Sequence, residues 1–163
     1  MQPNHAFDRV AARYDELWTN TAIGRAQRDL VWRDMEALFQ PGERIFDIGC
    51  GTGEDAAHFA ARGIAVYATD ASPAMIGIAQ ARGGFSAAVC SAEELTQTGG
   101  VFDGAISNFG ALNCVQDLPD VARSLGRSIG EFKKGRAEGE REAREAREAA
   151  AKKEDAGKTD EKQ

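Results

Sequence analysis

The sequence predicts an α/β protein: a Rossmann-like, three-layer arrangement built on about four parallel strands, followed by a charged helical or disordered tail. Between residues 44 and 129, apolar stretches of strand length alternate with amphipathic stretches of helix length, which is typical of parallel strands joined by helical crossovers. The first apolar stretch leads into Gly49, Gly51 and Gly53, a turn typical of nucleotide-binding sheets. Large apolar residues end at Phe132. We therefore expect a domain over residues 1–130 and a low-complexity tail over residues 131–163.

Local signals place each element of this domain. The expected helices cover residues 7–18, 22–39, 54–61, 73–82 and 117–129, and the expected strands cover residues 44–48, 64–69, 85–89 and 102–107. Pro41 and Gly42 end the second helix, and Gly63 ends the third. Ser72 is a good N-cap with Pro73 at the first helical position. Ligands of such sheets bind beyond the carboxyl ends of the strands, where the strand order reverses.

Composition excludes several functions. The formal net charge of -6 argues against nucleic-acid binding as the main activity. The three cysteines form no C-x-x-C motif, the N-terminus carries no signal peptide, and no apolar run approaches the length of a membrane span, so we expect a cytoplasmic protein. The Arg-Glu-Ala repeats of residues 141–149 lack the apolar positions of a coiled coil. They indicate a solvated tail or, alternatively, a partner-binding helix.

The glycine turn favours a cationic ligand. A dinucleotide fingerprint has the spacing G-x-G-x-x-G, whereas residues 49–53 read G-x-G-x-G. Glu54 and Asp55 at the start of the next helix would repel a pyrophosphate, and the absence of a lysine after Gly53 excludes a P-loop. An acidic rim suits the sulfonium and ammonium groups of S-adenosylmethionine better than NAD or ATP. The structural alternative is a turn that only allows close packing.

Asp70 ends the second expected strand. A carboxylate at this place can accept hydrogen bonds from both hydroxyl groups of a ribose. Alternatively, it stabilises the N-terminus of the helix that begins at Pro73. The glycine turn upstream favours the ribose role.

Two segments carry a resemblance to a known family. Residues 47–53 (DIGCGTG) and 68–75 (ATDASPAM), with the pair Tyr14-Asp15, resemble class I S-adenosylmethionine-dependent methyltransferases that act on small molecules. The resemblance extends over residues 7–129 and implies a small-molecule methyl acceptor. The residues that it places at the cofactor are Tyr14, Asp47, Gly49, Cys50, Gly51, Asp70, Ala71, Met75, Ser91, Ala92 and Asn108.

The resemblance also implies their roles. Gly49 and Gly51 lie against the methionine part of the cofactor, in a turn ordered by Asp47, and Asp70 holds the ribose. Met75 or Ala71 lies near the adenine, whose edge is read from Ser91 and Ala92, where relatives have an acidic residue instead of the serine. Asn108 contributes backbone contacts to the amino-acid end. Tyr14 closes over the cofactor or, alternatively, is an ordinary core aromatic residue.

Methyl transfer is an in-line displacement that depends on positioning more than on proton transfer. The motifs indicate no catalytic acid or base and no metal ligands. We expect His58 to have a packing or surface role and His5 to lie in a terminal segment.

The last part of the sequence departs from this family. Relatives continue with further strands after residue 129, whereas this chain continues with its charged tail. We therefore expect a truncated or frame-shifted methyltransferase, with the cofactor half-site present and the acceptor half-site largely missing. The fourth strand becomes an edge suited to self-association. Two alternatives remain open: a non-catalytic remnant that binds the cofactor or a partner, and a fragment of an NAD-dependent oxidoreductase.

Overall fold

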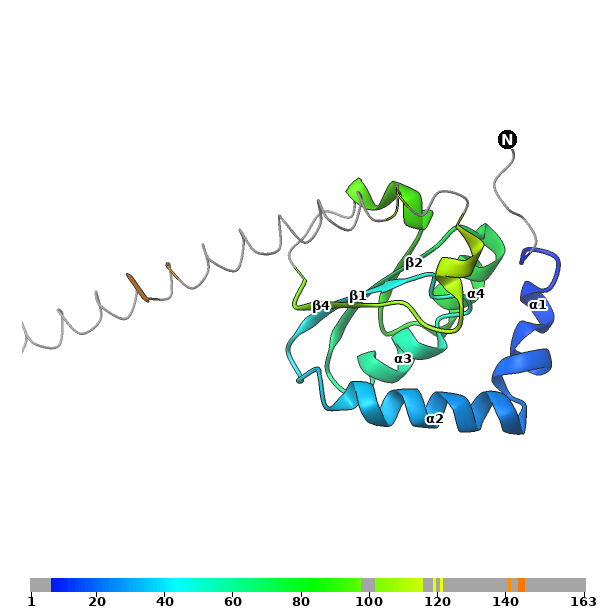
Figure 1. Cartoon of the computed structure of the whole chain (residues 1–163), viewed down its shortest axis with the longest axis horizontal. Helices are drawn as coiled ribbons and strands as arrows, with labels where there is room; N and C mark the ends of the chain where they lie inside the picture. Colours follow the sequence, from blue (N-terminus) through cyan, green and yellow to red (C-terminus); the bar gives the residue numbers. More distant parts are fainter. Residues whose placement is uncertain are drawn as a thin grey trace, which may run out of the picture.

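The computed structural model describes residues 7–97, 102–115, 119, 121, 141, 144 and 145. Its centre is a parallel four-stranded sheet in the order β3-β2-β1-β4 (Figure 1). The strands are β1 (Arg44–Ile48), β2 (Ala65–Asp70), β3 (Ser86–Val89) and β4 (Gly104–Ile106). The sheet confirms the predicted α/β fold, and its strand order reverses between β1 and β4, where such sheets bind their ligands.

Short connections place a helix between successive strands. The helices are α1 (Ala11–Tyr14), the π-helix η1 (Asp15–Thr19), α2 (Ala22–Glu36), α3 (Glu54–Ala60), α4 (Pro73–Arg82), and the 3₁₀-helices η2 (Ala92–Gln97) and η3 (Ala111–Cys114). Ser72 caps α4 as predicted, because its hydroxyl accepts a hydrogen bond from the backbone N–H of Met75 at 3.1 Å. Thr21 caps α2 in the same way, through the backbone N–H of Gly24 at 3.0 Å.

Some predicted boundaries differ from the structure. The first helix begins only at Ala11 and continues from Asp15 as a π-helix, because the backbone N–H of Asn20 reaches back five residues to the Asp15 carbonyl. The second helix ends at Glu36 rather than at residue 39, and the strand ladder of β4 covers three of the six predicted residues. Most of the predicted helix over residues 117–129 and most of the tail lie outside the described residues.

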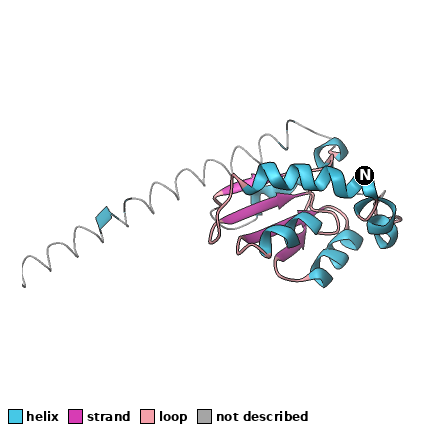
Figure 2. Cartoon of the chain, turned by 90° about the horizontal axis from the view of Figure 1, so that it is seen from below, coloured by secondary structure: helices cyan, strands magenta, loops and turns pink. Residues whose placement is uncertain are grey.

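The sheet packs apolar side chains on both faces. One face meets α2 and α3 through a cluster of Ile45, Ala56, Phe59, Ile64, Val66, Ala68 and Ile106, and Figures 1 and 2 show α2 running along it. The opposite face buries Phe46, Ile48 and Leu95. Because successive side chains of a strand point to opposite faces, Asp47 lies on the α2/α3 side with Ile45. A carboxylate is therefore buried on the side of the sheet that α2 and α3 cover.

None of the helices in the described part of the chain has the length and hydropathy needed to cross a bilayer. Among the described strands, β4 lies at one end of the sheet order.

Candidate cofactor site

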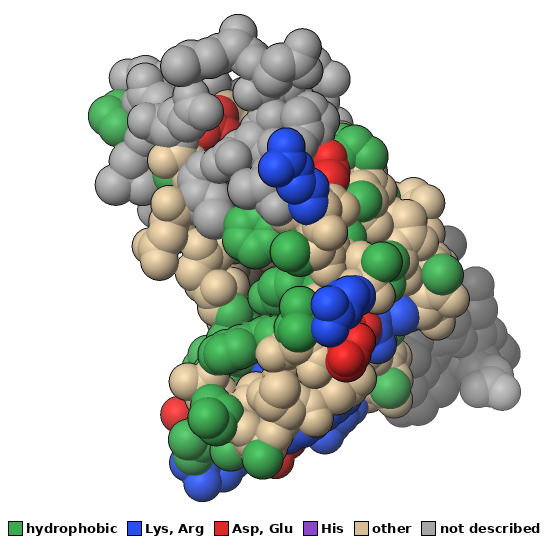
Figure 3. Space-filling view, turned by 90° about the vertical axis from the view of Figure 1, so that its right-hand side faces the viewer, with side chains coloured by type: hydrophobic (Ala, Val, Ile, Leu, Met, Phe, Trp, Pro, Cys, Tyr) green, Lys and Arg blue, Asp and Glu red, His purple; other side chains and the backbone are tan. Residues whose placement is uncertain are grey.

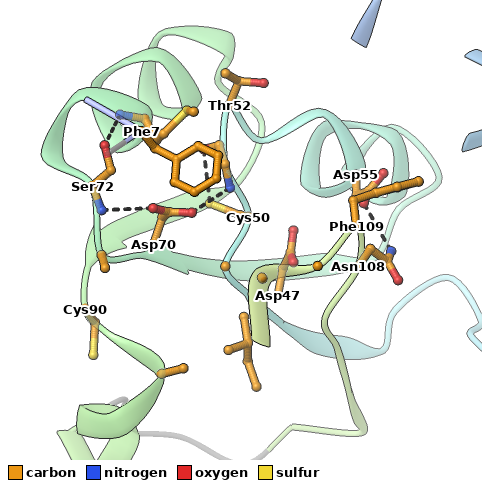
Figure 4. Close-up of a pocket in the computed structure, with 18 of the residues that line it drawn as sticks. Phe7, Asp47, Cys50, Thr52, Asp55, Asp70, Ser72, Cys90, Asn108 and Phe109 are labelled. Atoms are coloured by element: carbon orange, nitrogen blue, oxygen red, sulfur yellow. Dashed lines mark hydrogen bonds between the residues drawn. The ribbon is translucent and has the colours of Figure 1, made fainter. Parts of the chain in front are cut away.

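A cavity opens at the carboxyl ends of the strands (Figure 4). Ten of the residues that the sequence predicts at the cofactor line it: Tyr14, Asp47, Gly49, Cys50, Gly51, Asp70, Ala71, Met75, Ala92 and Asn108. Ser91 is not among the lining residues. The Ser91 carbonyl accepts a hydrogen bond from the backbone N–H of Glu94 at 3.0 Å, in a tight turn. The residues of this turn that line the cavity are Ala92 and Glu93.

The three glycines of the turn have different roles. All have left-handed backbones, with φ of 74° at Gly49, 54° at Gly51 and 78° at Gly53, which favours glycine. A Cβ at Gly49 would lie 2.2 Å from the Cβ of Ala111, and one at Gly53 would lie 2.6 Å from Cζ of Phe85. A Cβ at Gly51 would meet nothing within 4 Å. Close packing therefore explains Gly49 and Gly53, whereas Gly51 leaves open space beside the cavity.

Asp70 links the two turns that border the cavity. Its Oδ2 accepts the backbone N–H of Gly51 and its Oδ1 accepts that of Ser72, both at 2.9 Å (Figure 4). The bond to Ser72 lies at the start of α4, as one of the two alternatives predicted. The carboxylate can still accept bonds from ribose hydroxyls, because an ionised carboxylate has about four lone-pair sites and these bonds use two. The carboxylate holds the glycine turn against the start of α4 and keeps acceptor capacity for hydroxyl groups.

Asp47 is a buried carboxylate without a full set of partners. Its side chain is 2% exposed, and its Oδ2 has no hydrogen-bond partner among the described residues. Burial raises the pKa of Asp47 well above its usual range, and the nearby Asp55 carboxylate raises it further, whereas the Arg28 guanidinium opposes both effects. An unpaired buried acceptor at a cavity wall is suited to a cationic group such as the ammonium of S-adenosylmethionine.

The sequence did not predict a buried polar network that lies near Asp47. Arg28, 5% exposed, places its Nη1 2.5 Å from Oδ1 of Asp55. The same Oδ1 accepts the indole N–H of Trp32 at 2.7 Å, and Oδ2 accepts the side-chain amide of Asn108 at 3.1 Å. Nε of Arg28 has no partner among the described residues. An arginine within an amphipathic helix resembles a surface residue in sequence, which explains why its burial was not predicted.

Phe109 completes this side of the cavity. It adopts φ of 53°, which bulky residues rarely do, and its ring centroid lies 4.5 Å from Cζ of Arg28. The sequence contains no local signal for this positive φ directly after Asn108.

The N-terminal segment contributes two aromatic residues to the cavity wall. Tyr14 and Phe7 both line it, in an edge-to-face contact with ring centroids 6.3 Å apart. Burial raises the pKa of the Tyr14 hydroxyl. Figure 3 shows this end of the molecule, where apolar side chains surround a hollow.

Among the described side chains, Cys50, Cys90 and His58 show no sign of an activated nucleophile or a metal site. Cys50 and Cys90 are free thiols on the cavity wall, and burial raises the pKa of both, which disfavours the thiolate. His58 stacks on Trp32 at 3.7 Å and is hydrogen-bonded to Glu36 at 2.8 Å, so it packs between α2 and α3 as expected. The described residues contain no cluster of side chains suited to a metal ion.

Fold and cavity together define a class I S-adenosylmethionine-dependent methyltransferase. Residues 45–130 match the family model described as a methyltransferase domain, and the chain belongs to this family. The predicted family and its cofactor are thereby confirmed.

Curated relatives agree with this assignment. A demethylmenaquinone methyltransferase of Beutenbergia cavernae is 36% identical over 123 residues, which cover 73% of this chain and 50% of that protein. An uncharacterised protein of Methanocaldococcus jannaschii is 34% identical over 107 residues, 66% of this chain and 39% of that protein. The chain thus spans half or less of the length of these relatives.

Solved structures show the same fold. A phosphoethanolamine N-methyltransferase of Haemonchus contortus, in complex with phosphomonomethylethanolamine and S-adenosylhomocysteine, aligns with a TM-score of 0.61 and 23% identity, over 77% of this chain and 31% of that one. An S-adenosylmethionine-dependent methyltransferase of Mesorhizobium loti aligns with a TM-score of 0.52 and 28% identity, over 60% of this chain and 47% of that one.

Proposed function

We propose that this chain binds S-adenosylmethionine in the cavity between the glycine turn and α4 and takes part in methyl transfer to a small molecule. The observation that carries the proposal is the buried, unpartnered carboxylate oxygen of Asp47 beside the left-handed turn at Gly51. A phosphate-binding turn would gain nothing from that carboxylate, whereas an ammonium group would compensate its burial.

The cavity offers complementary groups for each part of the cofactor. Asp47 would face the ammonium group, the unpartnered Nε of Arg28 would face the carboxylate, and Asp70 would accept the ribose hydroxyls. Ala71, Met75 and Ala92 also line the cavity and would provide apolar surface for the adenine. The bound cofactor supplies an electrophilic methyl group on its sulfonium.

The protein's contribution is orientation and exclusion of water. Tyr14 and Phe7 cover the cavity from the N-terminal segment, and Asn108 is held by Asp55 at the opposite side. Burial raises the pKa of the Cys50 and Cys90 thiols, which disfavours the nucleophilic thiolate of both residues.

We propose that residues 1–130 form the cofactor-binding part of a methyltransferase, that residues 131–163 form a separate charged tail, and that the methyl acceptor is a small molecule. The matches cover 50% and 39% of the two relatives, so both relatives extend beyond the part that this chain matches, which supports this division. Because the matches cover half or less of these relatives, we expect weak cofactor binding and low turnover from the isolated monomer. The outer place of β4 supports self-association through that edge, which sedimentation velocity would measure.

Titration calorimetry of the full chain with S-adenosylhomocysteine and with NADH tests the proposal. We expect saturable binding of S-adenosylhomocysteine at one site and no binding of NADH. Binding of NADH without binding of S-adenosylhomocysteine would contradict the proposal in favour of an oxidoreductase. A methyl-transfer assay with radiolabelled S-adenosylmethionine and candidate acceptors then separates an enzyme from a protein that only binds the cofactor.

A further inference from the structure

The N-terminal wall of the cavity is attached to the rest of the protein through polar contacts. Of residues 7–19, only Ala11 and Thr19 are buried, whereas Phe7, Val10 and Leu17 are among the exposed large apolar residues. Figure 1 shows α1 beside α4, with which it is in contact. Segments with few buried apolar contacts open at low free energy. What holds this wall in place therefore decides how readily it opens.

Asp15 makes the first link between the wall and the glycine turn. Its Oδ1 accepts the hydroxyl of Thr52 at 2.7 Å, and its Oδ2 pairs with Nη2 of Arg82 at the end of α4. Nε of Arg82 donates to the carbonyl of Thr52 at 2.6 Å. Asp15 directly follows Tyr14, and Thr52 directly follows Gly51. These bonds therefore connect the N-terminal wall of the cavity to the glycine turn.

Further ion pairs extend this link into a closed ring. Nη1 of Arg82 lies 2.6 Å from Glu54 at the start of α3, and the other carboxylate oxygen of Glu54 lies 2.5 Å from Nη1 of Arg25 in α2. Nη2 of Arg25 donates to Oδ1 of Asn20 at 2.5 Å, and the backbone N–H of Asn20 donates to the carbonyl of Asp15 at 2.7 Å. We name these two acidic and two basic residues, Asp15, Arg82, Glu54 and Arg25, the charged ring.

We propose that the charged ring is the clasp of a movable wall, and that its opening sets the rates at which S-adenosylmethionine enters and S-adenosylhomocysteine leaves the cavity. The inference rests on the proposed function. The ring joins η1, α2, α3 and α4 around the glycine turn, and its charges balance. Its side chains are partly exposed, so dissolved salt reaches them and weakens their pairing.

Arg82→Met is the main test variant because it removes two ion pairs of the ring, with Asp15 and Glu54, and the bond to the Thr52 carbonyl, while Arg82 itself does not line the cavity. Arg13→Met is the matched control. It removes one positive charge and one ion pair, with Glu16, from the N-terminal wall of the cavity, but it leaves the charged ring intact. Arg82→Lys retains the charge without the planar fork of donors and should give an intermediate result. Thermal melts establish that each variant is folded.

The measured quantities are the association and dissociation rates of tritiated S-adenosylhomocysteine with the full chain. For Arg82→Met we expect both rates to rise by about threefold to tenfold, the range for loss of one or two weak ion pairs. For Arg13→Met we expect no change. Raising NaCl from about 0.05 M to 0.5 M should speed both rates in the unaltered chain and have little effect in Arg82→Met. If Arg82 only stabilised the fold, its replacement would not raise the association rate and the dissociation rate together.

Two outcomes overturn separate statements. If the unaltered chain binds S-adenosylhomocysteine and Arg82→Met leaves both rates at their original values, or raises only dissociation, the ring does not control a movable wall. If the unaltered chain does not bind S-adenosylhomocysteine, the proposed function is wrong, and the proposed role of the charged ring is wrong with it. Hydrogen exchange of residues 10–20 in the ligand-free chain gives an independent readout: faster exchange in Arg82→Met supports the clasp, and unchanged exchange contradicts it.

Discussion

Arg28 of α2 and Asp55 of α3 form a buried ion pair on the wall of the candidate cofactor cavity, with 2.5 Å between Nη1 and Oδ1. The carboxylate of Asp55 also accepts bonds from Trp32 and from Asn108, which follows β4. One side chain thus joins two helices to the end of the sheet. The pair also lies close enough to the Asp47 carboxyl to influence its pKa.

Asp55→Asn should strongly destabilise the fold. The substitution leaves the Arg28 guanidinium buried without a counter-ion and turns one hydrogen-bond acceptor into a donor facing other donors. We expect urea denaturation to show a loss of about 3–5 kcal/mol in the free energy of unfolding, the range for a broken buried ion pair. Asp34→Asn, which removes an exposed pair with Arg33, is the control and should change stability by less than about 1 kcal/mol. Equal losses of unfolding free energy in the two variants would show that the contacts of Asp55 stabilise the fold no more than an exposed ion pair does.

Asp47→Asn should stabilise the ligand-free chain at neutral and higher pH. Because burial raises the folded-state pKa of Asp47, the stabilisation due to its proton is complete below the unfolded value of 3.8 and is lost as pH rises through the folded value. The neutral amide escapes this loss. Urea denaturation at several pH values should therefore show an advantage of Asp47→Asn that grows with pH.

The same residue should govern affinity for the cofactor. A cationic ligand favours the ionised carboxylate, so the affinity of the unaltered chain for S-adenosylmethionine should rise with pH, and that of Asp47→Asn should be lower and independent of pH over the same range. Calorimetry measures both. An affinity that Asp47→Asn leaves unchanged would remove Asp47 from the binding site.

Two glycine substitutions should have opposite consequences. Gly49→Ala places a methyl group 2.2 Å from the Cβ of Ala111, so its thermal midpoint should fall markedly. Gly51→Ala meets no neighbouring atom within 4 Å and bears only the left-handed backbone penalty of about 1–2 kcal/mol. Its methyl group lies beside the cavity, so binding of S-adenosylhomocysteine should fall by at least tenfold. Retained binding by Gly51→Ala would mean that the ligand does not approach the turn.

Asp70→Ala should abolish cofactor binding. The change removes the acceptor for the ribose hydroxyls and also releases the backbone N–H groups of Gly51 and Ser72. Asp70→Asn separates these effects, because its one amide oxygen retains part of the turn geometry without the charge. We expect its affinity for S-adenosylhomocysteine to fall by about 1.5–3 kcal/mol, the contribution of a hydrogen bond to a charged group. Full affinity in Asp70→Asn would contradict the ribose role.

The stability of the protein should decrease below about pH 6.5 because of His58. Burial lowers the pKa of this imidazole from 6.5, although its hydrogen bond to Glu36 opposes the shift. The unfolded chain therefore takes up a proton at a higher pH than the folded chain, and stability is lost as pH falls below the unfolded value. Urea denaturation should show a weaker decline between about pH 7 and pH 5 in His58→Gln. An identical decline in both proteins would assign it to other groups.

Local signals in the sequence explain much of the fold. Ser72 and Pro73 define the start of α4 through contacts within one turn, and the alternation of apolar stretches yields the parallel sheet. The buried state of Arg28 escaped prediction because it depends on a partner far along the chain, and the sequence contains no local signal for the left-handed backbone of Phe109. Ser91 precedes a 3₁₀-helix that the motif does not specify, and the residues of this segment that line the cavity are Ala92, which was predicted, and Glu93, which was not.

An NMR titration of the ¹⁵N-labelled full chain with S-adenosylhomocysteine tests whether the glycine turn and the start of α4 form the cofactor site. We expect saturable shifts of the backbone amide resonances of Gly49, Gly51 and Ser72, with residues on the α2/α3 surface, such as Arg62, unaffected. Saturable shifts confined to another surface, or none at millimolar ligand, would contradict this placement of the site.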